Sequence, residues 1–397
     1  MSHLPRKEFT ILTGARQTGK STLLRQMEKA CKENGMPTLF LNLEQKPLLE
    51  DLNTSPLNLV RYLPQTDRKV IVFLDEVQYL DDPSNLLKLI FDEHAEQVKI
   101  IASGSSAFYI DRKFKDSLAG RKRIFQLTAC SFAEYLELKG KSDLLSEFNR
   151  LSTVTGSKSA SLPYLQMEWE EYMIYGGYPA IILEGSFKEK IERLKEIRDS
   201  YIKRDIQESG INSEQSFYML LALLAGQTGC LVNTNELSST LRIKHETVSA
   251  YLSIMEKSFH ISLVRPFFRN LRKELVKMPK IYFLDTGLRN CMVNNFQALH
   301  QRPDRGELWE NMVFKLLLDQ HGKEEIYYWR TSAGNEVDFV LPSIADPHAF
   351  EAKYDSGQVR HGKYKSFQSA YPEIPLSFVH LHPFRETLFQ SVPFSRG

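Results

Sequence analysis

The amino-acid sequence predicts an α/β fold of several domains that begins with a doubly wound parallel sheet. Its 397 residues exceed what one ordinary hydrophobic core organises. The run "KVIVFLDEVQYL" (69–80) has the uninterrupted apolar character of a strand buried on both faces of a parallel sheet. Residues 9–12 are predicted to form a β-branched strand, and residues 37–43 are a further strand candidate. Residues 21–35, between residues 9–12 and 37–43, have helical periodicity. This alternation of strands and helices is typical of a parallel α/β domain.

Composition is that of a soluble globular protein, with 42% hydrophobic and 25% charged residues. The longest apolar stretch, "YMLLALLAG" from Tyr218, is about half of the ~20 residues that a membrane span requires. The N-terminal residues show neither a secretory signal nor a lipid anchor. We therefore expect a cytoplasmic protein without a membrane partner. The net charge of +2 means that any contact with DNA would depend on local basic clusters.

The stretch "TGARQTGKST" (residues 13–22) has the spacing of a phosphate-binding loop, G-x-x-x-x-G-K-[ST], between a strand and a helix. Glycines let backbone N–H groups turn inward toward phosphates, Lys20 reaches the terminal phosphates, and the Ser21 hydroxyl binds Mg²⁺. The sequence thus predicts a site for ATP and Mg²⁺. Its loop residues are Gly14, Ala15, Arg16, Gln17, Thr18, Gly19, Lys20, Ser21 and Thr22.

Two acidic residues, Asp75 and Glu76, end the buried run "KVIVFLDE". Downstream of a phosphate loop, an acid at this strand end supports Mg²⁺, and an adjacent glutamate polarises the attacking water. A further buried strand, "VKIIASGSS", ends in Ser103 and Ser105. Either these serines sense the γ-phosphate or they cap the helix that follows.

Arg121, in "LAGRKRIFQL", comes just before another strand. An arginine in this place either reaches the phosphates of a neighbouring copy as a finger or is an ordinary exposed arginine. A finger would require a homo-oligomer, such as a ring. The predicted catalytic residues are Lys20, Glu76, Ser103 and Arg121.

The middle of the chain holds a second kind of pattern. Residues 140–165 lack sustained periodicity and predict a loop or linker, after which helical patterns resume. A helix at 236–241, a turn at 243–244, a second helix at 246–257 and a hairpin-like segment then match a winged helix-turn-helix. Its basic residues either contact DNA phosphates or form a solvated face on a module that binds protein. They are Arg242, Lys244, His245, Arg265, Arg269, Arg272 and Lys273.

The C-terminal part predicts an acidic constellation. Glu310 lies in a predicted helix. Of the three predicted strands that follow it, the second, "GNEVDFVLP", carries Asp338. Glu351 and Lys353 share one face of the third, "AFEAKY". An acid on one strand and E-x-K on the next match the PD-(D/E)-x-K nuclease core. In that core, carboxylates hold one or two Mg²⁺ ions and the lysine stabilises developing charge. An accidental E-x-K is the alternative, since the spacing is common.

The chain resembles the bacterial and archaeal ATPases of the AAA superfamily that carry a C-terminal nuclease-like domain of unknown function. The stretches that carry the resemblance are "GARQTGKST", "FLDEVQYL", "SGSSAF", "LAGR", "TACSFAEYL", "YGGYPAII" and "YIKRDI". It implies an AAA-type ATPase domain with a helical lid at 1–205, a winged helix-turn-helix at 206–275, and a restriction-endonuclease-like α/β domain at 276–397. In this family, the fold of the last domain does not by itself imply cutting.

Phosphate loop, winged helix and nuclease-like acids have DNA as their common partner. The sequence therefore predicts a Mg²⁺-dependent ATP hydrolase coupled to binding or remodelling of DNA, with branched and single-stranded DNA as candidate forms. Two alternatives stay open. One is a nucleotide-switched nuclease that cuts DNA with Glu310, Asp338, Glu351 and Lys353. The other is a signalling ATPase whose C-terminal half binds protein.

Overall fold

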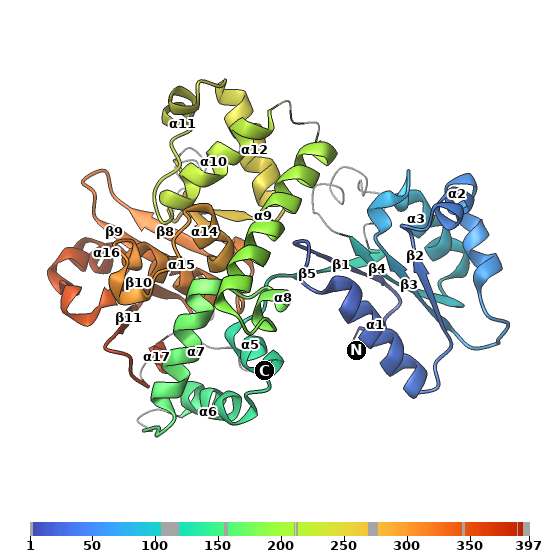
Figure 1. The fold of residues 1–397 in the computed structure, drawn as a ribbon, viewed down its shortest axis with the longest axis horizontal. Coiled ribbons are helices and arrows are strands. Elements are labelled where there is room, and N and C mark those ends of the chain that lie inside the picture. Colours follow the sequence, from blue (N-terminus) through green and yellow to red (C-terminus); the bar gives the residue numbers. More distant parts are fainter. Residues whose placement is uncertain are drawn as a thin grey trace. The chain divides into compact units, whose positions relative to one another are not determined.

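The computed structural model describes residues 3–104, 118, 120–154, 158–209, 211, 213–268, 277–343, 346–386 and 388–391. The chain forms two compact units, the first made mainly of residues 1–128 and the second mainly of residues 129–397 (Figure 1). The first unit ends earlier than the predicted ATPase domain at 1–205, because the helices after residue 128 pack with C-terminal elements instead. Within the described ranges, no helix is both long and apolar enough to cross a membrane.

A five-stranded parallel sheet forms the first unit, with the strand order β2-β3-β4-β1-β5. This order places β4 between the strand that leads into the phosphate loop and the strand that ends in Asp75. The elements are β1 (Phe9–Gly14), α1 (Lys20–Glu33), β2 (Thr38–Asn42), α2 (Lys46–Thr54), η1 (Pro56–Tyr62), β3 (Val70–Asp75), η2 (Val77–Tyr79), α3 (Pro83–His94), β4 (Val98–Gly104) and β5 (Lys122–Leu127).

Helices cover both faces of this sheet, as the sequence predicts. Successive residues of β3 point to opposite faces and join different cores. Val72 packs in a cluster with Ile90 of α3, whereas Phe73 packs in a cluster with Leu24 of α1. Figure 1 shows α1 and α3 on opposite sides of the strands. The prediction of an α/β fold with a parallel sheet is confirmed for this unit.

The second unit combines helices with a six-stranded mixed sheet of order β11-β10-β9-β8-β6-β7. Its helices are α5 (Phe132–Leu138), α6 (Ser142–Thr153), α7 (Leu162–Tyr175), α8 (Pro179–Ile182), α9 (Phe187–Ser209), α10 (Glu214–Gly226), α11 (Thr234–Leu241), α12 (His245–Lys257), α14 (Thr286–Met292), α15 (Arg305–Leu318), α16 (Lys365–Ala370) and α17 (Leu388–Ser391). Its strands are β6 (Ile261–Pro266), β7 (Lys280–Phe283), β8 (Tyr327–Arg330), β9 (Glu336–Leu341), β10 (His348–Asp355) and β11 (Leu376–His382).

The segment predicted as a wing belongs to this sheet. Strand β6 pairs antiparallel with β7 and parallel with β8, where Arg265 lies opposite Tyr327. The sheet therefore includes residues on both sides of the boundary predicted at 275–276, because the hydrogen-bonding edges of β6 are occupied by later strands. Arg269, Arg272 and Lys273 lie outside the described residues.

The loop predicted at residues 140–165 is wrong for much of its length, since α6 occupies Ser142–Thr153 and α7 begins at Leu162. Phe148 and Leu151 of α6 are buried, at a spacing of one helical turn. Leu144, Leu145, Phe148 and Leu151 recur at helical spacing, so the period of this helix was present in the sequence. The prediction gave more weight to the Ser, Thr, Lys and Gly residues that follow it.

A close contact between backbone segments holds the second unit together around α14. A Cβ atom on Gly287 would lie 2.0 Å from the carbonyl oxygen of Tyr175, so only glycine permits this approach. The buried Asp285 carboxylate accepts hydrogen bonds from the backbone N–H groups of Gly177 (2.7 Å) and Leu288 (2.8 Å). The turn after α7 is thereby fixed to the start of α14.

In the first unit, one buried lysine fixes the N-terminal segment. Lys99 of β4 is fully buried, and its ammonium group donates to the carbonyl oxygens of His3 (3.1 Å), Arg6 (2.9 Å) and Glu8. Burial penalises the charge and lowers the pKa of Lys99 to about 8, although Glu8 opposes the shift.

We expect Lys99→Met to destabilise the protein by about 1–3 kcal/mol, because the carbonyl groups lose their buried donor. The pKa of Lys99 is lower in the folded chain than in the unfolded chain, so the unfolded state binds more protons at pH values above about 8. Stability of the wild type therefore gains from this group as the pH rises through that range.

Urea unfolding followed by circular dichroism between pH 7 and 10 measures both effects, with the exposed Lys29→Met as the control. The difference in stability between the wild type and Lys99→Met should grow with pH. A difference that stays constant or shrinks would contradict the assignment.

Candidate functional site

The loop between β1 and α1 has the backbone form of a phosphate-binding loop. A Cβ atom on Gly14 would lie 2.0 Å from the carbonyl oxygen of Leu127 on β5, so no other residue fits there. Gln17 (φ 57°) and Gly19 (φ 90°) take left-handed conformations that turn the chain into α1. Of the other predicted loop residues, Ala15 is buried, Arg16 half-buried and Thr22 exposed.

Lys20 lies inside this loop. Its buried ammonium group donates to the carbonyl oxygens of Gly14 (3.0 Å) and Ala15 (2.7 Å), and the Thr18 hydroxyl donates to the same Ala15 oxygen at 2.8 Å. Burial lowers the pKa of Lys20 to about 8, while Glu76 opposes the shift. The loop therefore holds its cation close to its own backbone, where an anionic phosphate would replace the carbonyl contacts.

The carboxylate of Asp75 connects the loop to two strands. Asp75 is 4% exposed, and its Oδ1 atom accepts from the hydroxyl of Ser21 at 3.1 Å and from that of Ser103 at 2.5 Å. The Ser103 hydroxyl oxygen in turn accepts from the backbone N–H of Glu76 at 3.1 Å. The structure thus brings Ser21, Asp75, Glu76 and Ser103 together. A hydroxyl and a carboxylate side by side are oxygen ligands of the kind that Mg²⁺ prefers, so these residues fit that ion.

Glu76 lies in a left-handed backbone conformation (φ 62°, ψ 50°) directly after β3. Burial raises the pKa of its carboxyl group, while a hydrogen bond from the Gln78 side chain and the charge of Lys20 oppose the shift. A raised pKa suits a group that accepts a proton near neutral pH. Gln78 is a residue that sequence reasoning missed, since its only signal is its position two residues after Glu76.

The Arg121 side chain pairs with Asp92 of α3, through Nε at 2.8 Å and a terminal nitrogen at 3.3 Å. Its backbone carbonyl accepts from the N–H of Phe9 at 2.8 Å. Within one copy, Arg121 therefore ties the residue before β5 to α3 and to the start of β1. A finger that acts on a neighbouring copy stays a prediction. Ser105 lies outside the described residues.

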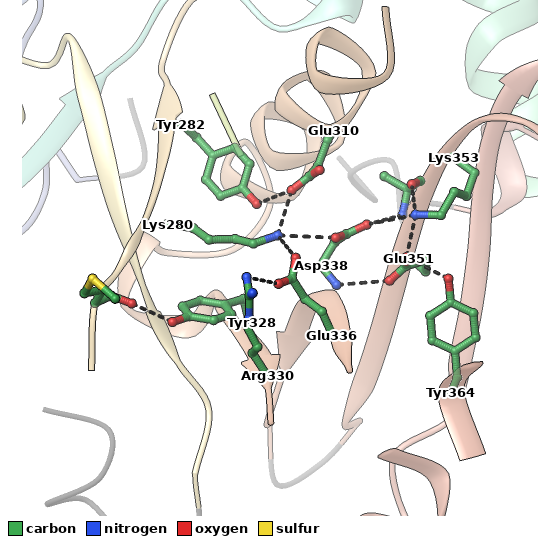
Figure 2. Close-up of polar contacts among 12 residues, drawn as sticks. Lys280, Tyr282, Glu310, Tyr328, Arg330, Glu336, Asp338, Glu351, Lys353 and Tyr364 are labelled. Atoms are coloured by element: carbon green, nitrogen blue, oxygen red, sulfur yellow. Dashed lines mark hydrogen bonds and ion pairs between the residues drawn. The ribbon is translucent and has the colours of Figure 1, made fainter. Parts of the chain in front are cut away.

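The four residues predicted for the nuclease-like site also come together (Figure 2). Glu310 projects from α15, Asp338 from β9, and Glu351 and Lys353 from β10. Lys353 Nζ is 2.5 Å from Glu351 Oε1 and 3.8 Å from Asp338 Oδ2. The backbone N–H of Asp338 donates to Glu351 Oε2 at 3.3 Å.

Two charged residues of this group were missed by the sequence analysis. Lys280 of β7 is 2% exposed, and its ammonium group is 3.0 Å from Glu310 and 3.3 Å from Asp338. Glu336, two residues before Asp338 on β9, is 2.5 Å from the same ammonium group. The spacing of Glu336 and Asp338 was a readable signal of a shared face. Lys280 gave none, because its strand lies far away in the sequence.

The electrostatics of this group differ from those of an open acidic site. Burial and the neighbouring Asp338 raise the pKa of both Glu310 and Glu351. Burial alone would lower the pKa of Lys280, but the carboxylates, Glu310 first, outweigh it and raise that pKa well above its ordinary value. The described ranges contain no group of three or more His, Cys, Asp or Glu residues arranged to hold a metal ion. The ammonium group of Lys280 contacts Glu310 and Asp338, two of the three carboxylates predicted to bind Mg²⁺, and the metal site stays a prediction.

Comparison with known proteins supports the assignment of the phosphate-loop site. Residues 6–136 match the family described as an AAA domain. Together, match and geometry support an AAA-type P-loop ATPase domain. Residues 166–299 and 305–385 match two domains of unknown function (DUF8612 and DUF4143), so a nuclease fold is not confirmed by family.

Similar proteins occur in bacteria and archaea. An uncharacterized protein of Mycobacterium tuberculosis is 24% identical over 89% of this chain and 72% of its own length. One of Methanocaldococcus jannaschii is 24% identical over 95% of this chain and 82% of its own length. Among solved structures, the RuvB Holliday junction branch migration motor of Thermotoga maritima is 15% identical, with a TM-score of 0.31 over 66% of this chain and 85% of its own. AMPPCP-bound DnaA of Aquifex aeolicus is 18% identical, with a TM-score of 0.31 over 63% and 81%.

We expect Ser103→Ala to lower kcat for ATP hydrolysis by roughly 10- to 100-fold, because hydrogen bonds to a buried carboxylate contribute about 1.5–3 kcal/mol. Ser103 positions Asp75 and the backbone of Glu76, so KM for ATP should change little. Ser152→Ala, which removes a hydroxyl bonded to a helix carbonyl at 2.8 Å, is the control. An unchanged kcat in Ser103→Ala would contradict this positioning role.

Proposed function

We propose that this protein is a Mg²⁺-dependent ATP hydrolase that couples ATP hydrolysis to the binding or remodelling of DNA. The observation that supports ATP hydrolysis is the hydrogen-bonded series Ser21–Asp75–Ser103–Glu76, which joins the phosphate loop to the Asp75 carboxylate and to the backbone N–H of Glu76. The hydrolytic part rests on the fit of these residues to a nucleoside triphosphate and its metal ion.

Each residue has a separate task in this proposal. Loop N–H groups and the N-terminus of α1 bind phosphate oxygens, and Lys20 supplies positive charge to the terminal phosphates. Ser21 and Asp75 hold Mg²⁺, which would neutralise charge on the phosphates. Glu76 accepts a proton from the attacking water, and the left-handed turn at this residue aims its side chain independently of Asp75.

The proposed DNA contact lies in helices α11 and α12. The two helices are joined by residues 242–244, and the Ser238 hydroxyl fixes this turn by donating to the carbonyl of Ile243 at 2.7 Å. Phe217 of α10 packs edge-on against Tyr251 of α12, with ring centroids 5.3 Å apart, so α10 supports α12. Arg242, Lys244 and His245 are exposed at the turn and at the start of α12. The positive charges of Arg242 and Lys244 suit contacts to a phosphate backbone.

We expect Glu76→Gln to keep ATP affinity and to lower kcat by about 10²- to 10⁴-fold, since the amide cannot accept a proton. Lys20→Ala should weaken ATP binding itself, which separates binding from chemistry. The measurements are steady-state phosphate release and titration with a fluorescent ATP analogue. Glu44→Gln, at an exposed position, serves as the control. Rapid hydrolysis by Glu76→Gln would show that Glu76 is not the group that accepts the proton from water.

For the DNA half, we expect steady-state ATP hydrolysis to rise when single-stranded, duplex or branched DNA is added, with Lys20→Ala as the blank. Lys244→Glu should weaken DNA binding, measured by fluorescence anisotropy, more than Lys29→Glu on α1. The effect should decrease as salt rises, because phosphate contacts are screened. Hydrolysis that ignores every form of DNA, with no DNA retained, would instead favour a protein partner.

A further inference from the structure

The ammonium group of Lys280 lies where the carboxylates of the second unit converge (Figure 2). We call Glu310, Glu336, Asp338 and Glu351 the carboxylate cluster. Lys280 Nζ is 3.0 Å from Glu310 Oε1, 2.5 Å from Glu336 Oε1 and 3.3 Å from Asp338 Oδ1. With 2% of its side chain exposed, this lysine is held inside the protein and does not lie along the surface.

Two tyrosine hydroxyls and a backbone N–H also donate to the carboxylate cluster. The Tyr282 hydroxyl donates to Glu310 Oε1 at 2.6 Å, and the Tyr364 hydroxyl donates to Glu351 Oε1 at 2.7 Å. Asp338 Oδ2 accepts from the backbone N–H of Ala352 at 3.0 Å. The bonds to Glu310 and Asp338 fix two of the carboxylates that contact Lys280, whereas Glu351 is held by Tyr364 and Lys353.

Two further cationic side chains offset part of the negative charge of the carboxylate cluster. Lys353 Nζ is 2.5 Å from Glu351 Oε1, and an Arg330 nitrogen is 3.0 Å from Glu336 Oε2. Three cationic side chains therefore face four carboxylates. Buried ion pairs persist where geometry and hydrogen bonds compensate the loss of hydration, and both conditions hold here.

A divalent ion would have to share these carboxylates with an ammonium group at contact distance. Mg²⁺ binds its carboxylate ligands at ~2.0–2.1 Å, and the oxygens of Glu310, Glu336 and Asp338 that contact Nζ are not open to it while they pair with the ammonium group. Two cations in one poorly solvated place repel strongly. Removal of Lys280 from its partners would leave a buried charge unpaired, which is costly.

We propose that the carboxylate cluster takes no divalent cation, because Lys280 is its built-in counterion, and that the second unit therefore does not cut nucleic acids by metal-assisted hydrolysis. This assignment is independent of the proposed ATPase function. It treats the E-x-K pattern of Glu351 and Lys353 as part of an internal ion-pair network of the sheet.

Calorimetric titration of the nucleotide-free full chain with Mn²⁺ tests the proposal directly. Wild type and Asp338→Asn should give superimposable titrations, since Asp338 holds no metal in either. A Mn²⁺ site in the wild type that Asp338→Asn removes would overturn the proposal. This comparison is informative even if variants at Lys280 fail to fold.

The second experiment removes Lys280 to test whether its ammonium group excludes the metal ion. Lys280→Met combined with Glu336→Gln removes one positive and one negative charge and leaves Glu310, Asp338 and Glu351. This double variant should gain a Mn²⁺ site that the wild type lacks, and adding Asp338→Asn should abolish it. A folded double variant, verified by circular dichroism, that gains no Mn²⁺ site would show that Lys280 is not what excludes the ion.

Plasmid nicking with Mg²⁺ or Mn²⁺ provides a separate readout. Wild type should cut no faster than Asp338→Asn. Faster, Asp338-dependent cutting by the wild type would overturn the proposal and restore the nuclease alternative. ATP hydrolysis and its response to DNA are measured separately, so failure of the proposed function would not change this result.

Discussion

The strand order of the first sheet is the constraint on which the nucleotide site depends. Because β4 lies between β1 and β3, the phosphate loop and the acids after β3 are one strand apart. Ser103 at the end of β4 spans this interval, donating to Asp75 and accepting from the backbone of Glu76. The parallel direction of all strands brings their carboxyl ends to one edge, so three separate loops can share one carboxylate. The residues of the site therefore come together because they lie at the carboxyl ends of neighbouring parallel strands.

The second unit solves a different physical problem, which is the burial of many charges. Arg289 and Arg302 are almost fully buried and both pair with Asp304, the latter at 2.8 Å. The pKa of Asp304 lies well below its ordinary value because hydrogen bonds from these arginines outweigh its partial burial. Lys280 and its carboxylates follow the same rule in the sheet. A unit that pairs its buried cations with its own acids has fewer acids available for an external metal ion.

Sequence reasoning succeeded where the chemistry is local. Gly14, Gly19, Lys20 and Ser21 lie within eight residues, and the requirement for a tight, phosphate-facing turn fixes their types and spacing. Buried parallel strands were recognisable from continuous apolar runs. Helix α6 was missed although its apolar residues recur at helical spacing. The pairing of β6 with β8 was missed because strand pairing cannot be read from one strand alone.

The sequence by itself determined the phosphate loop and the acids at the end of β3, since each depends on the spacing of neighbouring residues. For Glu310, Asp338, Glu351 and Lys353 it offered a nuclease-like pattern, with an accidental E-x-K as the alternative. Only the tertiary structure decided which hydroxyl holds Asp75 and which cation fills the carboxylate cluster. Both depend on which strands lie side by side. Lys280 precedes Asp338 by 58 residues, and only the folding of β7 and β9 into one sheet brings the ammonium group to the acids.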